Sequence, residues 1–360
     1  MQERQILIFL NFLQEISPKK INQIWQAFED KLEILRNTQK LKELNLKEKV
    51  IDKIKNKKIR DKFKKELDLA YKKGIKIITI LDKEYPQILR EIYDPPPVLY
   101  IKGKFDPCSL NLAIVGTRRA SFYGLSQSEY FAYELALRGV VIISGLARGI
   151  DTYAHKGALK AKSPTYAVLG SGLDNIYPPE NRNLAQQIVE KGALISEFPL
   201  ETPPFKKNFP QRNRIISGLS FGVFVIEAGR KSGALITADF ALEQGREVFA
   251  LPNQITNTQS QGVLNLIKEG AKLVTSPFDI LEELPLDFKR KVVKENKEKI
   301  ELTENEERIL KVLESPLYFD EILSSTRLEP KVLNTTLLEL KLKDLIEFLP
   351  GGKYARKKGF

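Results

Sequence analysis

The sequence of 360 residues predicts an α/β protein built on an open, doubly wound and mostly parallel sheet. Short apolar runs rich in β-branched residues alternate with helical segments from residue 112 onward. Residues 1–72 precede this alternation and carry helical patterns only. A helix–turn–helix pattern with two short strands follows it and predicts a winged helix at the C-terminus.

The segment 1–72 is expected to form a small basic helical domain. Ser17 and Pro18 provide an N-cap followed by proline at the first helical position. The apolar residues behind this cap recur at three- and four-residue spacing: Ile21, Ile24, Trp25, Phe28, Leu32 and Leu35.

The charge of the chain points to an anionic partner. The net charge is +12 with a pI of about 9.4, which favours nucleic acid before a membrane surface. Between residues 31 and 73 the chain has 16 Lys and Arg against 7 Asp and Glu, a surplus of 16 − 7 = 9. The alternative is a set of solvated helix faces in a Lys- and Glu-rich chain.

The central strands and helices follow in order. Residues 75–81 form a β-branched run, and three prolines at 95–97 separate it from a second strand at 98–103. Further strands are expected at 112–116, 140–145, 165–170, 193–197, 221–228 and 247–252. Helices are expected at 121–139, 149–161, 179–192, 233–245 and 261–271, with a helical turn at 214–220. This alternation implies parallel strands with right-handed crossovers, whose carboxyl ends bind ligands.

The C-terminal part begins with a charged segment at 286–300, which is expected to be a linker. Thr303 and Glu306 then form a capping box at the start of a helix. Residues 301–360 are expected to be a winged-helix domain, for which contact with DNA and contact with protein both remain open.

Several classes of protein are disfavoured by composition. Cys108 is the only cysteine and His155 the only histidine, so a cysteine-based zinc site and a multi-histidine metal site are excluded. We expect no metal and no cofactor. No apolar stretch is long enough to span a bilayer, and the N-terminus lacks the features of a signal peptide. The cytoplasm is the expected compartment.

Five loops at one edge of the predicted sheet carry glycine, hydroxyl or arginine residues. The first, AIVGTRRAS, resembles a nucleotide-binding loop, although it is not G-x-G-x-x-G and has no P-loop lysine. We expect these loops to bind one extended anionic ligand. The candidate contacts in the first three loops are Gly116, Thr117, Arg118, Arg119, Ser144, Gly145, Arg148 and Arg182.

The segment NFPQRNRIISGLS places two arginines in front of an apolar run. Because a buried guanidinium needs partners for its charge, Arg212 and Arg214 bind either a ligand or the protein itself. Glu227, at the end of a predicted buried strand, is a candidate partner for either arginine or a catalytic carboxylate. Asp151 is expected to cap or to pair with an arginine, and His155 to be a packed residue.

Six segments stand in a fixed order between about residues 75 and 280: GTRRASFYG, SGLARGIDTYAHKGAL, TYAVLGSGLDNIYPPENRNLA, GALISEFPLETPP, NFPQRNRIISGLS and EAGRKSGALITADFALEQGREVFALP. In these segments the chain resembles the DNA-processing protein A family, DprA, also called Smf. The resemblance implies an extended Rossmann-like domain at 73–285, preceded by a SAM-like or helix-hairpin-helix-like domain at 1–72. It also implies a single-stranded DNA-binding protein that protects incoming DNA and loads the recombinase RecA onto it in natural transformation. Dimerisation through the Rossmann-like domain is implied as well, without an established catalytic activity.

The same resemblance places the loop from Gly116 to Arg119 on the DNA strand, together with Lys206 or Lys207 and with Phe209. The residue types agree, because an aromatic ring stacks on any base and basic side chains track phosphates. Arg212 and Arg214 are candidate DNA contacts on the same ground, with a structural role at the sheet edge as the alternative. Two rival functions remain. One is a nucleotide-binding enzyme such as a nucleoside-monophosphate phosphoribohydrolase, and the other is a structural scaffold.

Overall fold

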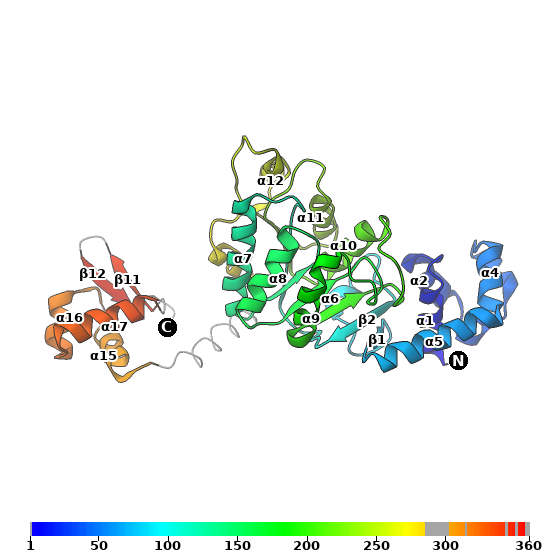
Figure 1. The fold of residues 1–360 in the computed structure, drawn as a ribbon, viewed down its shortest axis with the longest axis horizontal. Coiled ribbons are helices and arrows are strands. Elements are labelled where there is room, and N and C mark those ends of the chain that lie inside the picture. The colour runs from blue at the N-terminus through cyan, green and yellow to red at the C-terminus, as the bar shows by residue number, and fades with distance from the viewer. Residues whose placement is uncertain (1, 285–301, 314, 343–344, 350–351, 357–360) are drawn as a thin grey trace. The chain divides into compact units, whose positions relative to one another are not determined.

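The computed structural model describes residues 2–284, 302–313, 315–342, 345–349 and 352–356 (Figure 1). The chain divides into two compact units, Met1–Pro285 and Leu286–Phe360. The linker expected at 286–300 lies outside the described residues. The boundary expected between residues 72 and 73 stays a prediction.

The N-terminal segment is helical, as its periodicity predicts. Its helices are α1 (Glu3–Phe12), α2 (Pro18–Ala27), η1 (Lys31–Leu35), α3 (Thr38–Glu43), α4 (Glu48–Lys55) and α5 (Lys57–Lys72). The Ser17 side chain accepts a hydrogen bond from the backbone N–H of Lys20, and Pro18 opens α2, so the expected cap is confirmed. Of the expected apolar face, Leu32 is the one residue that lies exposed.

A nine-stranded sheet forms the centre of the larger unit, in the order β1-β2-β6-β5-β4-β3-β7-β8-β9. Its strands are β1 (Lys76–Thr79), β2 (Val98–Gly103), β3 (Asn111–Val115), β4 (Val141–Ser144), β5 (Thr165–Val168), β6 (Ala193–Ser196), β7 (Gly222–Val225), β8 (Glu247–Ala250) and β9 (Lys272–Leu273). From β6 to β9 all neighbours pair in parallel, and β1 and β2 pair antiparallel at the other edge. The mostly parallel, doubly wound sheet is confirmed. The two-residue strand β9 was missed because it is too short to show a pattern.

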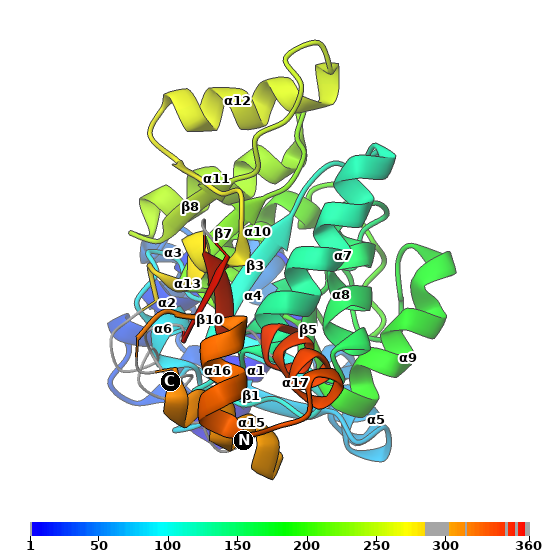
Figure 2. The same ribbon diagram turned by 90° about the vertical axis from the view of Figure 1, so that its left-hand side faces the viewer.

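Helices cover both faces of this sheet. They are α6 (Gln87–Arg90), α7 (Phe122–Leu137), α8 (Ile150–Lys160), η2 (Pro179–Asn181), α9 (Arg182–Lys191), α10 (Asn208–Gly218), α11 (Gly233–Glu243), η3 (Thr258–Ser260), α12 (Gln261–Lys268) and α13 (Pro277–Leu281). Figure 2 shows α7, α8 and α9 together on one side of the strands and α11 on the other. α10 begins at Asn208, six residues before the expected helical turn, because Pro210 is tolerated in a first helical turn.

The N-terminal helices share one apolar core with the sheet. Ile6 and Phe9 of α1 belong to the same buried cluster as Val98 and Tyr100 of β2. Two buried polar contacts cross the same boundary. The Asn11 side chain donates to the carbonyl of Glu197 over 2.9 Å, and the carboxyl group of Glu66 accepts from the N–H of Leu200 over 2.7 Å. Helices and sheet therefore form one compact body.

The smaller unit has the predicted winged-helix order. It consists of α15 (Glu304–Val312), β10 (Leu317–Tyr318), α16 (Phe319–Thr326), α17 (Pro330–Leu342), β11 (Ile346–Leu349) and β12 (Lys353–Arg356). The strands form an antiparallel sheet in the order β10-β12-β11. The expected capping box is confirmed, because Thr303 and Glu306 each bind the other's backbone N–H. Among the described residues of both units, none of the helices is long and apolar enough to cross a membrane.

His155 is a packed residue, as expected, and it makes the stability of the larger unit sensitive to acid. It is fully buried, and its Nδ1 lies 2.7 Å from the hydroxyl of Thr165. Burial lowers the pKa of His155 from 6.5 to about 3. Below pH 6.5 His155 is protonated in the unfolded chain but stays neutral in the folded chain, so the free energy of unfolding falls as the pH falls.

We expect this histidine to cost up to about 1.4 kcal/mol per pH unit between roughly pH 6 and pH 4. The measurement is urea unfolding of the protein and of His155→Gln across this range. The difference between their unfolding free energies isolates His155 from the carboxyl groups that titrate nearby. A difference independent of pH would contradict the burial of a neutral imidazole.

Candidate nucleic-acid interface

A cleft of about 720 Å³ lies at the carboxyl ends of the parallel strands. The loops after β3, β4, β5, β6 and β7 all contribute to its wall, as the sequence predicts. Its lining includes Thr117, Arg118, Arg119, Ala147, Asp151, Tyr177, Lys206, Phe209, Arg212, Asn213 and Thr237. Five segments that are distant in the sequence thus meet around one space.

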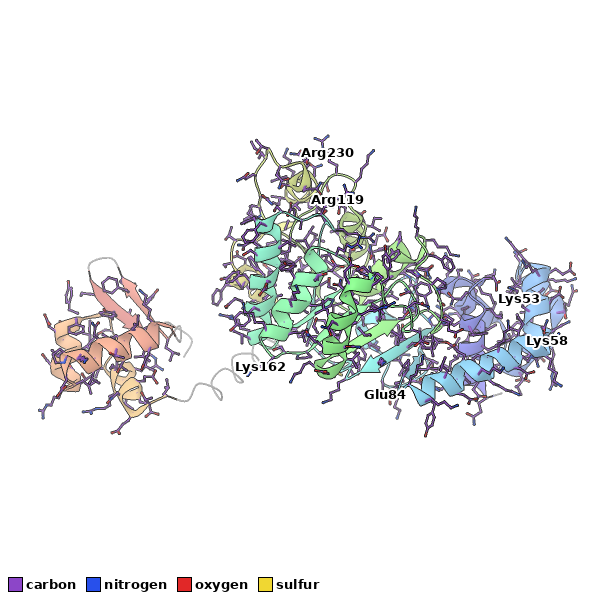
Figure 3. The ribbon with its side chains drawn as sticks, viewed as in Figure 1. Lys53, Lys58, Glu84, Arg119, Lys162 and Arg230 are labelled. Atoms are coloured by element: carbon purple, nitrogen blue, oxygen red, sulfur yellow. The ribbon has the colours of Figure 1, made fainter. Side chains whose placement is uncertain are left out.

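Three exposed cations surround this cleft: Arg118, Arg119 and Lys206. Figure 3 shows Arg119 at the end of the larger unit that carries α11 and α12. Within the described residues, none of the three takes part in an ion pair, so their charge faces solvent. Lys207 lies on the other side of its loop and lines different cavities. The structure therefore separates the two lysines, and Lys206 is the one beside Phe209 in the cleft.

Phe209 stands at the centre of an aromatic and cationic group. Its ring is half-buried, and the guanidinium carbon of Arg118 lies 5.3 Å from its centroid. The ring of Tyr177 lies 5.7 Å away at an interplanar angle of 57°. A flat ring between cations is suited to stack a base whose phosphates are bound alongside. Tyr177 was missed from the sequence, where its signal was an aromatic residue directly before Pro178 in the loop after β5.

Arg212 lines the cleft, and its side chain also forms a structural clamp that joins the ends of β4 and β5. It is 3% exposed, and its guanidinium donates to the carbonyls of Gly145, over 2.7 Å, and of Val168. A Cβ atom on Gly145 would lie 2.4 Å from this guanidinium, so any larger residue there would displace Arg212 from its position. Burial lowers the pKa of Arg212 to about 10, which leaves it a cation at neutral pH.

Asp151 completes the clamp. Its carboxyl group accepts from the backbone N–H groups of Gly145, over 3.1 Å, and Ala147, over 3.3 Å. Burial raises the pKa of Asp151, and the charge of Arg212 and the two N–H groups oppose that rise. Asp151 is therefore a capping residue of the loop, as expected.

Arg214 does not line the cleft, and its placement supports the structural alternative rather than the expected contact with DNA. Its Nη2 lies 2.5 Å from a carboxyl oxygen of Glu197, and its Nε lies 3.6 Å from Asp94. Arg214 and Glu197 are both buried. The candidate pairing of Glu227 with Arg212 or Arg214 is not found among the described residues. The carboxyl group of Glu227 instead accepts from the N–H and hydroxyl of Ser121, over 3.0 and 2.9 Å, and braces the loop that carries Arg118 and Arg119.

Four other candidates have structural explanations or lie apart. The Ser144 hydroxyl is fully buried and donates to the carbonyl of Ile114 over 2.6 Å, so it cannot reach a ligand. Gly116 lines the cleft, but a Cβ there would meet the side chain of Ile150 at 2.4 Å, which means that packing requires the glycine. Arg148 is exposed beside Tyr177 and pairs with Glu180. Arg182 is exposed at the start of α9, outside the lining of the cleft.

Comparison with known proteins identifies the family. The model of the DNA recombination-mediator protein A family matches residues 76–285, which is more than half of the chain. The chain belongs to the DprA/Smf family. A second model, the DprA winged helix domain, matches residues 294–352. The earlier resemblance is thereby confirmed.

Individual DprA/Smf proteins resemble the chain over different lengths. Protein Smf of Escherichia coli is 54% identical over 202 residues, which is 56% of this chain and 54% of that protein. The structure of DprA from Streptococcus pneumoniae is 36% identical with a TM-score of 0.61, covering 79% of this chain and 99% of that one. A structure of DNA processing protein A from Helicobacter pylori, described for its single-stranded DNA binding mode, is 31% identical with a TM-score of 0.53. It covers 57% of this chain and 94% of that one.

The whole cleft lies within the part that matches the DprA/Smf family model, since its lining runs from Val115 to Thr237. The N-terminal helices up to Lys72 lie outside both family models. Any role of those helices must therefore be argued from this chain alone.

Proposed function

We propose that this protein binds single-stranded DNA in the cleft and protects it. The observation that carries the proposal is the half-buried ring of Phe209, which lies beside Arg118 in a cleft that Arg119 and Lys206 also line. The ring stacks on one base and the cations bind the phosphates on either side of it. Because stacking and phosphate contacts read no sequence, binding is tolerant of sequence and weakens with salt.

The experiment is fluorescence anisotropy of a short labelled oligo-dT strand, titrated at several salt concentrations beside duplex of the same length. Arg119→Ala is expected to weaken binding about 10-fold, because one charge-assisted phosphate contact is lost. The slope of log K against log salt should fall by about 0.7 in magnitude, the value for one phosphate of a single strand. Arg230→Ala removes an exposed arginine at the same end of the larger unit and serves as the matched control.

Equal weak binding of single strand and duplex, unchanged by Arg119→Ala, would contradict a site in the cleft. The charge of the chain would then act only as a nonspecific attraction.

A cellular role is proposed on the ground of family membership. We propose that the protein acts as a homodimer that loads RecA onto incoming strands in natural transformation, without catalysing a reaction of its own. Support comes from membership in a family whose model is named for recombination mediation. The test is RecA filament formation on strands coated with single-strand-binding protein. RecA should assemble faster with the protein than without it, and Arg119→Ala should reduce this gain.

The rival function is a nucleoside-monophosphate phosphoribohydrolase. Glu227, the candidate catalytic carboxyl group, is fully buried and engaged with Ser121. Incubation with nucleoside monophosphates separates the two functions, since release of free base would establish the enzyme.

A further inference from the structure

A second cavity of basic character lies beside the N-terminal helices. It has a volume of about 600 Å³. Lysines from three helix starts line it: Lys20 in the first turn of α2, Lys47 and Lys49 at the start of α4, and Lys207 directly before α10. We call the cavity lined by these four lysines the basic groove.

The positive charge of the basic groove is uncompensated. Within the described residues, none of its four lysines takes part in an ion pair. Glu15, the acidic residue of the lining, is paired with Lys53, which brings a further positive charge. Four lysines without acidic partners repel one another, and bound phosphates would relieve that repulsion.

One chain segment, residues 203–211, contributes side chains both to the cleft and to the cavities on the side of the basic groove. Pro204, Lys206 and Phe209 line the cleft. Lys207 lines the basic groove and, with Phe205, an adjoining cavity of about 620 Å³. A flexible anion leaving the cleft would therefore meet Lys206 and then Lys207 as it crosses this segment.

The adjoining cavity also contains a buried donor without a partner. Asn208 is 3% exposed, and its side-chain nitrogen has no hydrogen-bond partner among the described residues. An acceptor from a ligand would satisfy it. Carboxyl groups such as Glu197 and Glu201 also line that cavity, and their charge would keep phosphates toward the lysines of the basic groove.

We propose that the basic groove binds the sugar–phosphate backbone of single-stranded DNA that extends from the cleft across residues 203–207. This inference rests on the proposed function and adds a second segment to its binding site. It assigns the contact to N-terminal helices that lie outside the family models.

The experiment compares two triple variants with equal loss of charge. The groove variant carries Lys20→Gln, Lys47→Gln and Lys49→Gln. The control variant carries Lys55→Gln, Lys57→Gln and Lys58→Gln, which change exposed lysines of the same helical segment that line neither cavity. Figure 3 shows Lys58 on this segment. Urea unfolding confirms that both variants are folded. Anisotropy is then measured with oligo-dT strands of about 6 and about 25 nucleotides, within and beyond the range of one small binding module.

We expect the groove variant to bind the long strand about 10-fold more weakly and the short strand as the unmodified protein does. Its salt slope on the long strand should fall by about 2, that is roughly 0.7 for each of three lost phosphate contacts. The control variant should keep most of the long-strand affinity and most of the salt slope of the unmodified protein. Equal losses in the two variants, or an unchanged long-strand affinity in the groove variant, would overturn the inference.

The proposed function fails on a different result. If Arg119→Ala leaves binding of the short strand unchanged, the cleft is not the site, whatever the groove variant does.

Discussion

Replacing Arg214 by alanine is expected to lower the unfolding free energy of the larger unit by about 3–5 kcal/mol. The change leaves Glu197 buried and unpaired, and it removes the partner of Asp94. Burial already raises the pKa of Glu197, and the charge of Arg214 opposes that rise. Trp25 is the only tryptophan and lies in the larger unit, so its fluorescence during urea unfolding reports on this unit alone.

Two further variants make the Arg214 result decisive. Arg214→Met combined with Glu197→Leu should recover most of the lost stability, because an apolar pair replaces a buried ion pair at little cost. Lys206→Ala removes an exposed charge nearby and should change stability by less than about 0.5 kcal/mol. A stable Arg214→Ala protein with weakened DNA binding would instead return Arg214 to the DNA interface.

Replacing Phe209 by alanine is expected to weaken binding of single-stranded DNA by about 10- to 100-fold, since stacking on one base contributes roughly 1–3 kcal/mol. Phe209→Tyr keeps the ring and should bind within about 3-fold of the unmodified protein. The measurement is anisotropy with oligo-dT under the conditions used for Arg119→Ala.

A strand made of consecutive abasic sites tests whether stacking is the cause. This strand has phosphates but no bases, so Phe209→Ala and the unmodified protein should bind it equally. If Phe209→Ala loses as much on the abasic strand as on oligo-dT, the ring acts by holding Arg118, which lies 5.3 Å from its centroid.

The path of the chain was largely predictable from the sequence, because each element carries its own local signal. The caps at Ser17 and Thr303 and the alternation of strands and helices need only nearby residues. The meeting of five loops at one edge also followed, since parallel strands end on the same side.

The roles of Arg212 and Arg214 could not be predicted, because they depend on the phase of α10. Residues two apart in an α-helix differ by about 200° in the direction of their side chains, so the two arginines point to opposite sides of α10. Arg212 therefore reaches the carbonyls beside the cleft, while Arg214 reaches Glu197. The sequence does not reveal that α10 begins at Asn208, and without that starting point the directions of the two arginine side chains cannot be assigned.

The partner of Arg214 was misjudged for a topological reason. Glu197 and Glu227 both follow buried strands, β6 and β7, and the local sequence does not distinguish them. In the sheet, however, β5, β4 and β3 lie between these strands. Only the order of the strands reveals which of the two acids faces Arg214.

The core shared by α1 and β2 has a consequence for any long ligand of this protein. The helices that carry Lys20, Lys47 and Lys49 are not tethered by a flexible linker but are fixed against the sheet. A strand held in the cleft would therefore find the lysines at a constant separation, and no ordering of the protein would be needed before contact. When the strand also binds the basic groove, the DNA is the partner that loses conformational entropy. Each added nucleotide is therefore bound at a high effective concentration.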